Sequence, residues 1–213
     1  MADDDLILAE LLCARLVHDL SGPVGAVANG AELLEDAEPG TPGGDIVGEA
    51  VELLSVSAAA AVARLRFLRL ALGPHTGSQS PSELRRLSQD YFTKGATGGE
   101  AITLDWPTAL DAGLAALPGR LILNALMLGR DCLPRGGTLR MITPAAGTIL
   151  SLVAEGTNAA PAEAAKALAA TDASGLTARG AQGYFVARLA GQAGLRIAVT
   201  PQPGRVAITL NKG

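Results

Sequence analysis

A proline- and glycine-rich segment at residues 38–44 separates two long stretches whose apolar residues recur with the spacing of a helix. The pattern predicts one helix over residues 4–36 and a second over residues 45–72, ended by Gly73 and Pro74. Two long helices joined by a short turn form an antiparallel hairpin. A lone hairpin buries too little surface, so either the rest of the chain packs on it or two hairpins pair. Because both helices are rich in Leu, Ala and Val, we expect a dimeric four-helix bundle.

The composition indicates a globular chain with an acidic surface. Its 213 residues suit one large domain or two small ones with a proper core. Hydrophobic residues make up 48% and charged residues 18%, which argues against global disorder. The net charge of −4 and the pI near 5.2 argue against nucleic acid as a partner.

Cysteine usage and hydropathy favour a soluble cytoplasmic protein. Two cysteines are too few for a disulfide framework, and Cys13 falls on the apolar side of the first helix, where we expect it in the core. The acidic N-terminus argues against a signal peptide. No uninterrupted apolar run is long enough to span a bilayer, so we expect no membrane contact.

The second half of the chain mixes helices with strands. We expect helices over residues 81–91, 110–132 with a break near 118–119, 159–170 and 182–192, and strands over 101–106, 138–143, 148–154, 195–200 and 205–211. The last two strands flank a Pro-Gly turn and form a hairpin. Helices combined with a largely antiparallel sheet give an α+β fold.

His18 lies on the polar side of the first helix. At about 100° per residue it falls roughly 160° from the centre of the apolar arc, so its imidazole should face away from the core. It is either an ordinary solvated side chain or a group kept accessible for a partner. Asp19 follows directly, and Pro23 inside a helix costs about 3 kcal/mol and predicts a kink or a loosened turn. Most residues that share the His18 face are small: Leu11, Ala14, Arg15, Ser21, Gly22 and Gly25.

Three segments carry a resemblance to a known family: residues 13–23 with His18 and Pro23, residues 64–73 at the end of the second helix, and residues 121–137, which end in Leu-Pro-Arg-Gly-Gly. Together they resemble the core of sensor histidine kinases, and more closely the ChpT-type histidine phosphotransferases, over nearly the whole chain. The resemblance implies a hairpin domain for dimerisation and phosphotransfer over residues 1–76. It also implies a degenerate domain over residues 77–213, an α/β sandwich like the histidine-kinase ATPase domain.

The resemblance also implies where a kinase would hold ATP. The position of the Mg²⁺-binding Asn is taken by Leu128, Asn124 matches a less critical Asn one turn earlier, and Ala154 stands where an Asp would read adenine. The stretch around Gly156 and residues 179–184 are poor versions of the glycine boxes. Triphosphate binding without a metal ligand or a good glycine cradle would be weak, so we expect no ATP, cofactor or metal on this chain.

Similarity to these phosphotransferases implies a role in a bacterial phosphorelay. His18 would be the phosphorylated residue, and Asp19 would orient its ring or take up its proton, although an ordinary solvated acid is the alternative for Asp19. The phosphoryl group would pass between aspartates of response-regulator receiver domains, including the receiver of a hybrid kinase, with Mg²⁺ supplied by the receiver. The candidate receiver contacts are Arg15, Ser21, Gly22 and Gly25. For Arg15 the alternative is a plain solubilising charge.

Two other functions remain open at this point. One is a scaffold or inhibitor that binds receivers through the same hairpin without transferring a phosphoryl group. The other is an ATP-dependent histidine kinase, which the residues at the Asn and Asp positions disfavour.

Overall fold

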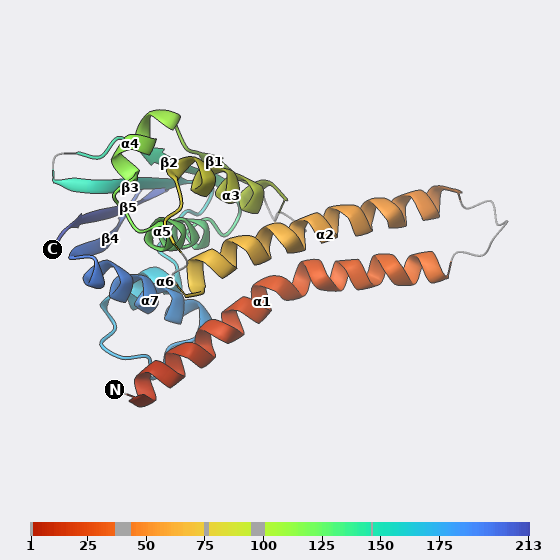
Figure 1. Cartoon of the computed structure of the whole chain (residues 1–213), viewed down its shortest axis with the longest axis horizontal. Helices are drawn as coiled ribbons and strands as arrows, with labels where there is room; N and C mark the ends of the chain where they lie inside the picture. Colours follow the sequence, from red (N-terminus) through yellow and green to blue (C-terminus); the bar gives the residue numbers. More distant parts are fainter. Residues whose placement is uncertain (1, 37–43, 75–76, 95–100, 146) are drawn as a thin grey trace.

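The two long helices form an antiparallel hairpin that extends away from the rest of the molecule (Figure 1). The computed structural model describes residues 2–36, 44–74, 77–94, 101–145 and 147–213. Helix α1 spans Ala2–Glu35 and α2 spans Gly44–Leu72, which confirms both expected helices to within two residues. The breaker segment lies almost entirely outside the described residues, as does the expected domain boundary after residue 76.

Small residues allow α1 and α2 to pack closely. A Cβ atom added at Gly30 would lie 2.9 Å from Cγ of Leu54, so the helices approach here to a distance that only glycine permits. On α2, the small residues Ala50, Ser57 and Ala60 are buried. Many of the larger apolar side chains of α1 and α2 lie outside this contact and remain exposed.

The hairpin leaves many apolar side chains uncovered in a single chain. Among the described residues, the exposed large hydrophobic side chains lie on α1 and α2, with Ile142 the one exception: Leu6, Val17, Val24, Leu33, Ile46, Val47, Val51, Leu53, Val56, Val62 and Leu65. Cys13 is also exposed, so its expected place in the core of the chain is wrong. The apolar arc of α1 is wider than the surface that α2 covers.

Helix α2 also meets the length and composition expected of a membrane span, over Ile46–Leu72. This differs from the expectation that no apolar stretch is long enough. An alanine-rich helix at the centre of a bundle has the same length and composition, so this feature alone is weak evidence for a membrane.

The remaining chain forms an α+β unit around one five-stranded mixed sheet. The strands are β1 (Ile102–Asp105), β2 (Gly137–Ile142), β3 (Thr148–Glu155), β4 (Leu195–Gln202) and β5 (Arg205–Lys212), in the order β1-β2-β3-β5-β4. The β1–β2 pair is parallel and the others are antiparallel. The helical segments are α3 (Pro81–Lys94), η1 (Thr108–Leu110), α4 (Asp111–Leu114), α5 (Gly119–Asp131), α6 (Glu163–Lys166), η2 (Ala167–Ala169) and α7 (Ala178–Gln192). The expected α+β class is confirmed.

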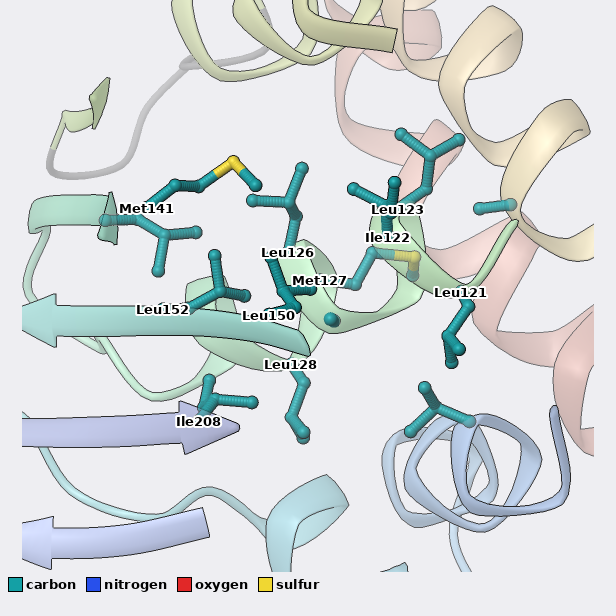
Figure 2. Packing of buried hydrophobic residues seen from close by; sticks show 14 of the residues in the cluster. Leu121, Ile122, Leu123, Leu126, Met127, Leu128, Met141, Leu150, Leu152 and Ile208 are labelled. Carbon is teal, nitrogen blue, oxygen red and sulfur yellow. The ribbon is translucent and has the colours of Figure 1, made fainter. Parts of the chain in front are cut away.

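The core of this unit lies between α5 and one face of the sheet (Figure 2). Leu150 and Leu152 on β3, with Ile208 on β5, point toward α5, whose own Leu126 and Leu128 are fully buried. Alternate residues of a strand face opposite sides of a sheet, so one face carries this core and the other is more open. The buried helix α5 is thereby fixed in position relative to the strands.

Two helices differ from the expectation. The helix expected over residues 159–170 is reduced to α6 and η2, because Pro161 lacks an amide donor and restricts Ala160 to an extended conformation. The helix expected over residues 110–132 begins only as η1 and α4 and restarts as α5 after Pro118. The predicted break near 118–119 is confirmed.

The start of α1 is anchored to the α+β unit. The carboxylate of Asp4 accepts hydrogen bonds from the amide of Ala173 and from the hydroxyl of Tyr184, the latter at 3.0 Å. Asp5 forms an ion pair of 2.7 Å with Arg188 on α7. These contacts hold the start of α1 against α7 (Figure 1).

Candidate functional site

His18 projects from α1 into solvent, as its helical position predicts. Its side chain is 65% exposed, and its Nδ1 lies 3.1 Å from Oδ1 of Asp19. A carboxylate can only accept a hydrogen bond, so a neutral imidazole in this pair carries its proton on Nδ1. The lone pair is then on Nε2, the ring nitrogen away from Asp19.

Asp19 is buried beside His18, and each of its two oxygens has a separate partner. Oδ1 faces His18, whereas Oδ2 accepts a hydrogen bond of 2.9 Å from Nε of Arg15 and lies 3.9 Å from Nη1 of Arg130. Burial by itself opposes ionisation, but the charge and hydrogen bond of Arg15, helped by Arg130 and His18, hold the pKa of the Asp19 carboxyl below its usual value. Asp19 is therefore an anion at neutral pH and no ordinary solvated acid.

Arg15 is only 2% exposed, so its expected place on the open face beside His18 is wrong. Its Nη1 and Nη2 donate hydrogen bonds of 2.9 and 3.0 Å to the carboxylate of Asp131, at the end of α5. Together with the bond to Asp19, the guanidinium bridges α1 to the α+β unit. A helical wheel shows that Arg15 is one turn from Asp19, but it carries no information about a residue 116 positions away.

Pro23 leaves one backbone acceptor of α1 without its usual donor. In an uninterrupted helix the carbonyl oxygen of Asp19 would accept from the amide of residue 23. Here it accepts a hydrogen bond of 2.8 Å from Nη1 of Arg64 on α2. Helix α1 continues through Pro23 as one element and changes direction partway along its length (Figure 1), in agreement with the predicted kink.

The other candidate receiver contacts, Ser21, Gly22 and Gly25, are exposed. Ser21 donates from its hydroxyl to the carbonyl of Val17 at 2.7 Å. A Cβ atom at Gly25 would meet nothing within 4 Å, and one at Gly22 only Nη1 of Arg64 at 3.9 Å. Packing within the chain therefore does not require glycine at either position. The structure brings Ser21, Gly22 and Gly25 together with His18 on one open surface.

Three residues around the site were not identified from the sequence: Asp131 and Arg130 on α5, and Tyr91 on α3. Nη1 of Arg130 donates a hydrogen bond of 2.6 Å to the hydroxyl of Tyr91 and its guanidinium lies over the Tyr91 ring. The ring of Tyr91 in turn stacks on Phe67. Each contact joins segments far apart in the sequence, so no local motif marks these residues. The spacing of Arg15 and Asp19 was the one local signal of this network.

The positions compared above with a nucleotide site are filled by core packing. Leu128 and Ala154 are fully buried, and Asn124 is buried with its amide donating to the carbonyls of Ala71 and Arg120, both at 2.8 Å. Gln182 donates to the backbone carbonyl of Asn124 at 3.0 Å and to its Oδ1 at 3.3 Å. Asn124 therefore ties α2, α5 and α7 together and has no side-chain donor or acceptor directed at solvent.

Two glycines of these boxes, Gly156 and Gly183, lie against backbone. A Cβ atom at Gly183 would lie 1.8 Å from the carbonyl oxygen of Ala164 on α6, and one at Gly156 would lie 2.5 Å from that of Gly136. At these two glycines, backbone of the chain itself therefore occupies the adjacent space. Among the residues that the structure describes, no group of three or more His, Cys, Asp or Glu side chains is arranged to hold a metal.

Comparison with known proteins identifies the family of this chain. Residues 81–205 match the family model described as the histidine phosphotransferase C-terminal domain. The protein phosphotransferase ChpT of Brucella abortus (strain 2308) is 30% identical over 204 residues, covering 91% of this chain and 90% of that protein. A solved structure at 1.7 Å of a bacterial phosphotransferase superposes with a TM-score of 0.74 at 26% identity and covers 97% of this chain and 96% of that chain. By these matches and by its fold, the chain belongs to the histidine phosphotransferase family, a membership that supports phosphotransfer in a phosphorelay.

Proposed function

We propose that this chain relays a phosphoryl group between response-regulator receiver domains through His18. The observation that carries the proposal is the exposed imidazole whose Nδ1 is engaged by the buried anion Asp19. In the forward step, the lone pair of Nε2 forms a bond to phosphorus while the acyl-oxygen–phosphorus bond of the aspartyl phosphate breaks. The receiver carboxylate leaves with the electron pair, and the proton on Nδ1 remains shared with Asp19. A second receiver carboxylate reverses this step.

Asp19 supports both directions of this reaction. The ring gains positive charge when Nε2 bonds to phosphorus, and an adjacent carboxylate stabilises that charge. Because Arg15 and Arg130 hold Asp19 as an anion, it acts by orientation and electrostatics and does not need to remove the proton. The Mg²⁺ that such chemistry uses would be bound by the receiver, and the buried apolar Leu128 at the position compared with the Mg²⁺-binding Asn supports this.

We infer that the phosphoryl group does not come from ATP bound to this chain. The burial of Leu128 and Ala154, the structural hydrogen bonds of Asn124 and the close backbone contact at Gly183 support this inference. The α+β unit would then be a kinase ATPase-like sandwich that has lost its nucleotide site and serves other purposes.

We also propose that two chains pair through their hairpins as a four-helix bundle. The uncovered apolar side chains of α1 and α2, Val62 among them, support this assembly, because a single chain exposes them to water. Val62→Glu should convert a dimer to a monomer in light scattering, whereas Ile142→Glu, at the exposed apolar residue of β2, should not. A wild-type chain that is monomeric would contradict the dimer. A cytoplasmic location follows for a protein that exchanges phosphoryl groups with soluble receivers.

One experiment tests the function directly. The protein is incubated with a receiver domain carrying a radiolabelled aspartyl phosphate, and separately with labelled ATP and Mg²⁺, as wild type and as His18→Ala. We expect acid-labile label from the receiver alone, absent in His18→Ala, and onward transfer to a second receiver. Label acquired from ATP would establish a kinase instead, and receiver binding without transfer would establish a scaffold.

A further inference from the structure

We propose that Asp131, which belongs to the α+β unit, is a positioning residue for His18 and acts through Arg15 and Asp19. The inference rests on the proposed function, and it assigns part of the phosphotransfer site to a residue outside the hairpin. The hydrogen bonds of the Asp131 carboxylate go to Arg15, whereas His18 is bonded to Asp19. The effect of Asp131 is on which oxygen of Asp19 remains available to the imidazole.

The first step is the division of the Arg15 donors. Arg15 gives Nε to Asp19 and both terminal nitrogens to Asp131, at 2.9, 2.9 and 3.0 Å. A guanidinium presents its donors in a rigid planar fork that matches a carboxylate with two parallel bonds. Asp131 takes the end of this fork, Nη1 and Nη2, and the bond to Asp19 comes from Nε alone.

The second step is the consequence for Asp19. With one bond from Arg15 to Oδ2, Oδ1 stays available for Nδ1 of His18 at 3.1 Å. Without the charge of Asp131, Arg15 would be free to turn its fork onto both oxygens of Asp19 and compete with His18. Arg130 stands 3.9 Å from Oδ2 and donates to Tyr91, so it reinforces the same orientation from α5.

The third step concerns the imidazole itself. A hydrogen bond to one ring nitrogen fixes which nitrogen carries the proton. Imidazole side chains in water favour the form with the proton on Nε2, which has no lone pair there. The Asp19 bond selects the opposite form, with the Nε2 lone pair directed at solvent. Asp131 therefore contributes to keeping the nucleophilic form of His18 populated.

Burial makes this arrangement specific. Arg15 and Asp19 are almost completely buried and the Asp131 side chain is 14% exposed, whereas His18 is open to solvent. A buried charged network holds its geometry only while each member keeps its partners. The site on α1 is thus completed by α5, and the α+β unit has a role in phosphotransfer that does not require nucleotide.

The test uses the full chain with Asp131→Asn, which keeps the size of the side chain and removes its charge. The readout is the tautomer of His18 from proton–nitrogen NMR correlations of the histidine ring, with His75, the other histidine, as an internal reference. We expect the His18 proton to move from Nδ1 toward Nε2 and the rate of phosphotransfer from the labelled receiver to fall roughly tenfold. Asp131→Glu should restore most of both properties.

Asp105→Asn is the matched control, since it breaks an ion pair with Arg140 that does not contact the network. It should change neither readout. If Asp131→Asn does not fold, Asp131→Ser serves instead, because it also removes the carboxylate from Arg15, keeps the guanidinium fork and should shift the tautomer in the same direction. An unchanged tautomer in a folded variant would overturn the proposal. A wild type that accepts no label would refute the proposed function, and the tautomer would still decide the positioning role.

Discussion

Nη1 of Arg64 on α2 donates a hydrogen bond of 2.8 Å to the carbonyl oxygen of Asp19 on α1, the acceptor that Pro23 leaves without a helical donor. The proline and the arginine are therefore complementary features of two different helices. One opens the backbone hydrogen-bond ladder directly after His18, and the other satisfies the oxygen thus released. Because Asp19 also contacts His18 through its side chain, the same residue is fixed by backbone and by side chain.

This relationship predicts a coupling between Arg64 and Pro23. Arg64→Met should lower the free energy of unfolding by about 1–3 kcal/mol, because the Asp19 carbonyl then lacks a donor. In a Pro23→Ala background the amide of residue 23 is restored, and the loss caused by Arg64→Met should be smaller by on the order of 1 kcal/mol. Urea denaturation of the four variants measures the coupling.

The neighbouring Arg66→Met provides the control, since Arg66 is exposed on the same helix. It should behave identically in both backgrounds. If Arg64→Met destabilises the wild type and the Pro23→Ala variant equally, the bond to the Asp19 carbonyl makes no separate contribution.

The sequence was sufficient to place His18 and insufficient to place Arg15, and the reason lies in the range of the interactions. The exposure of His18 follows from the period of one helix, which local spacing encodes. The burial of Arg15 depends on Asp131, which lies 116 residues further along the chain. For Cys13 the error is reversed, since it was expected in the core and is exposed. Periodicity gives the width of the apolar arc but not how much of that arc a single chain covers.

The same reasoning explains Asn124. Its position in the helix was predictable, and its similarity to a residue of a kinase site was visible. Its role was not, because the carbonyl of Ala71 that it binds belongs to α2 and the amide of Gln182 that binds it belongs to α7. The structural role of Asn124 depends on these long-range hydrogen bonds, which the local sequence does not show.

The open face beside His18 predicts opposite effects on stability and on transfer. Gly25→Leu should raise the free energy of unfolding by roughly 0.8 kcal/mol, since leucine is a better helix former and a Cβ at Gly25 meets no neighbour. The added side chain would obstruct a docking receiver, so phosphotransfer should fall by at least about tenfold. Thermal denaturation and the labelled-receiver assay measure the two effects.

Gly48 on α2 offers the matched control, because a Cβ there also meets nothing within 4 Å. Gly48→Leu should stabilise the helix by a similar amount and leave transfer unchanged. Equal transfer rates in Gly25→Leu and the wild type would show that this part of α1 does not contact the receiver.

The glycines of α7 predict a sharp contrast within one helix. Gly183→Ala should destabilise the protein by about 1–3 kcal/mol or more, because its Cβ would lie 1.8 Å from the Ala164 carbonyl oxygen and would push α6 away. Gly191→Ala meets no neighbour and should stabilise the helix by about 0.5–1 kcal/mol. Chemical denaturation measures both. Tolerance of alanine at Gly183 would mean that α6 does not close this glycine position.

Asp19 predicts a loss of stability in acid. Its folded-state pKa is held below the usual value, against the effect of burial, by Arg15 with help from Arg130 and His18. Above the unfolded-state pKa of about 3.9 the carboxyl is ionised in both states, and its contribution to stability is complete. As the pH falls below that value the unfolded chain takes up the proton first, and the contribution is lost as the pH falls through the folded-state pKa. Urea denaturation from pH 7 downward should show this acid-dependent loss of stability in the wild type and not in Asp19→Asn. Asp36→Asn is the control, because it removes an exposed carboxylate directly after α1 and should keep the loss. If Asp19→Asn loses as much unfolding free energy in acid as the wild type, the effect comes from other groups.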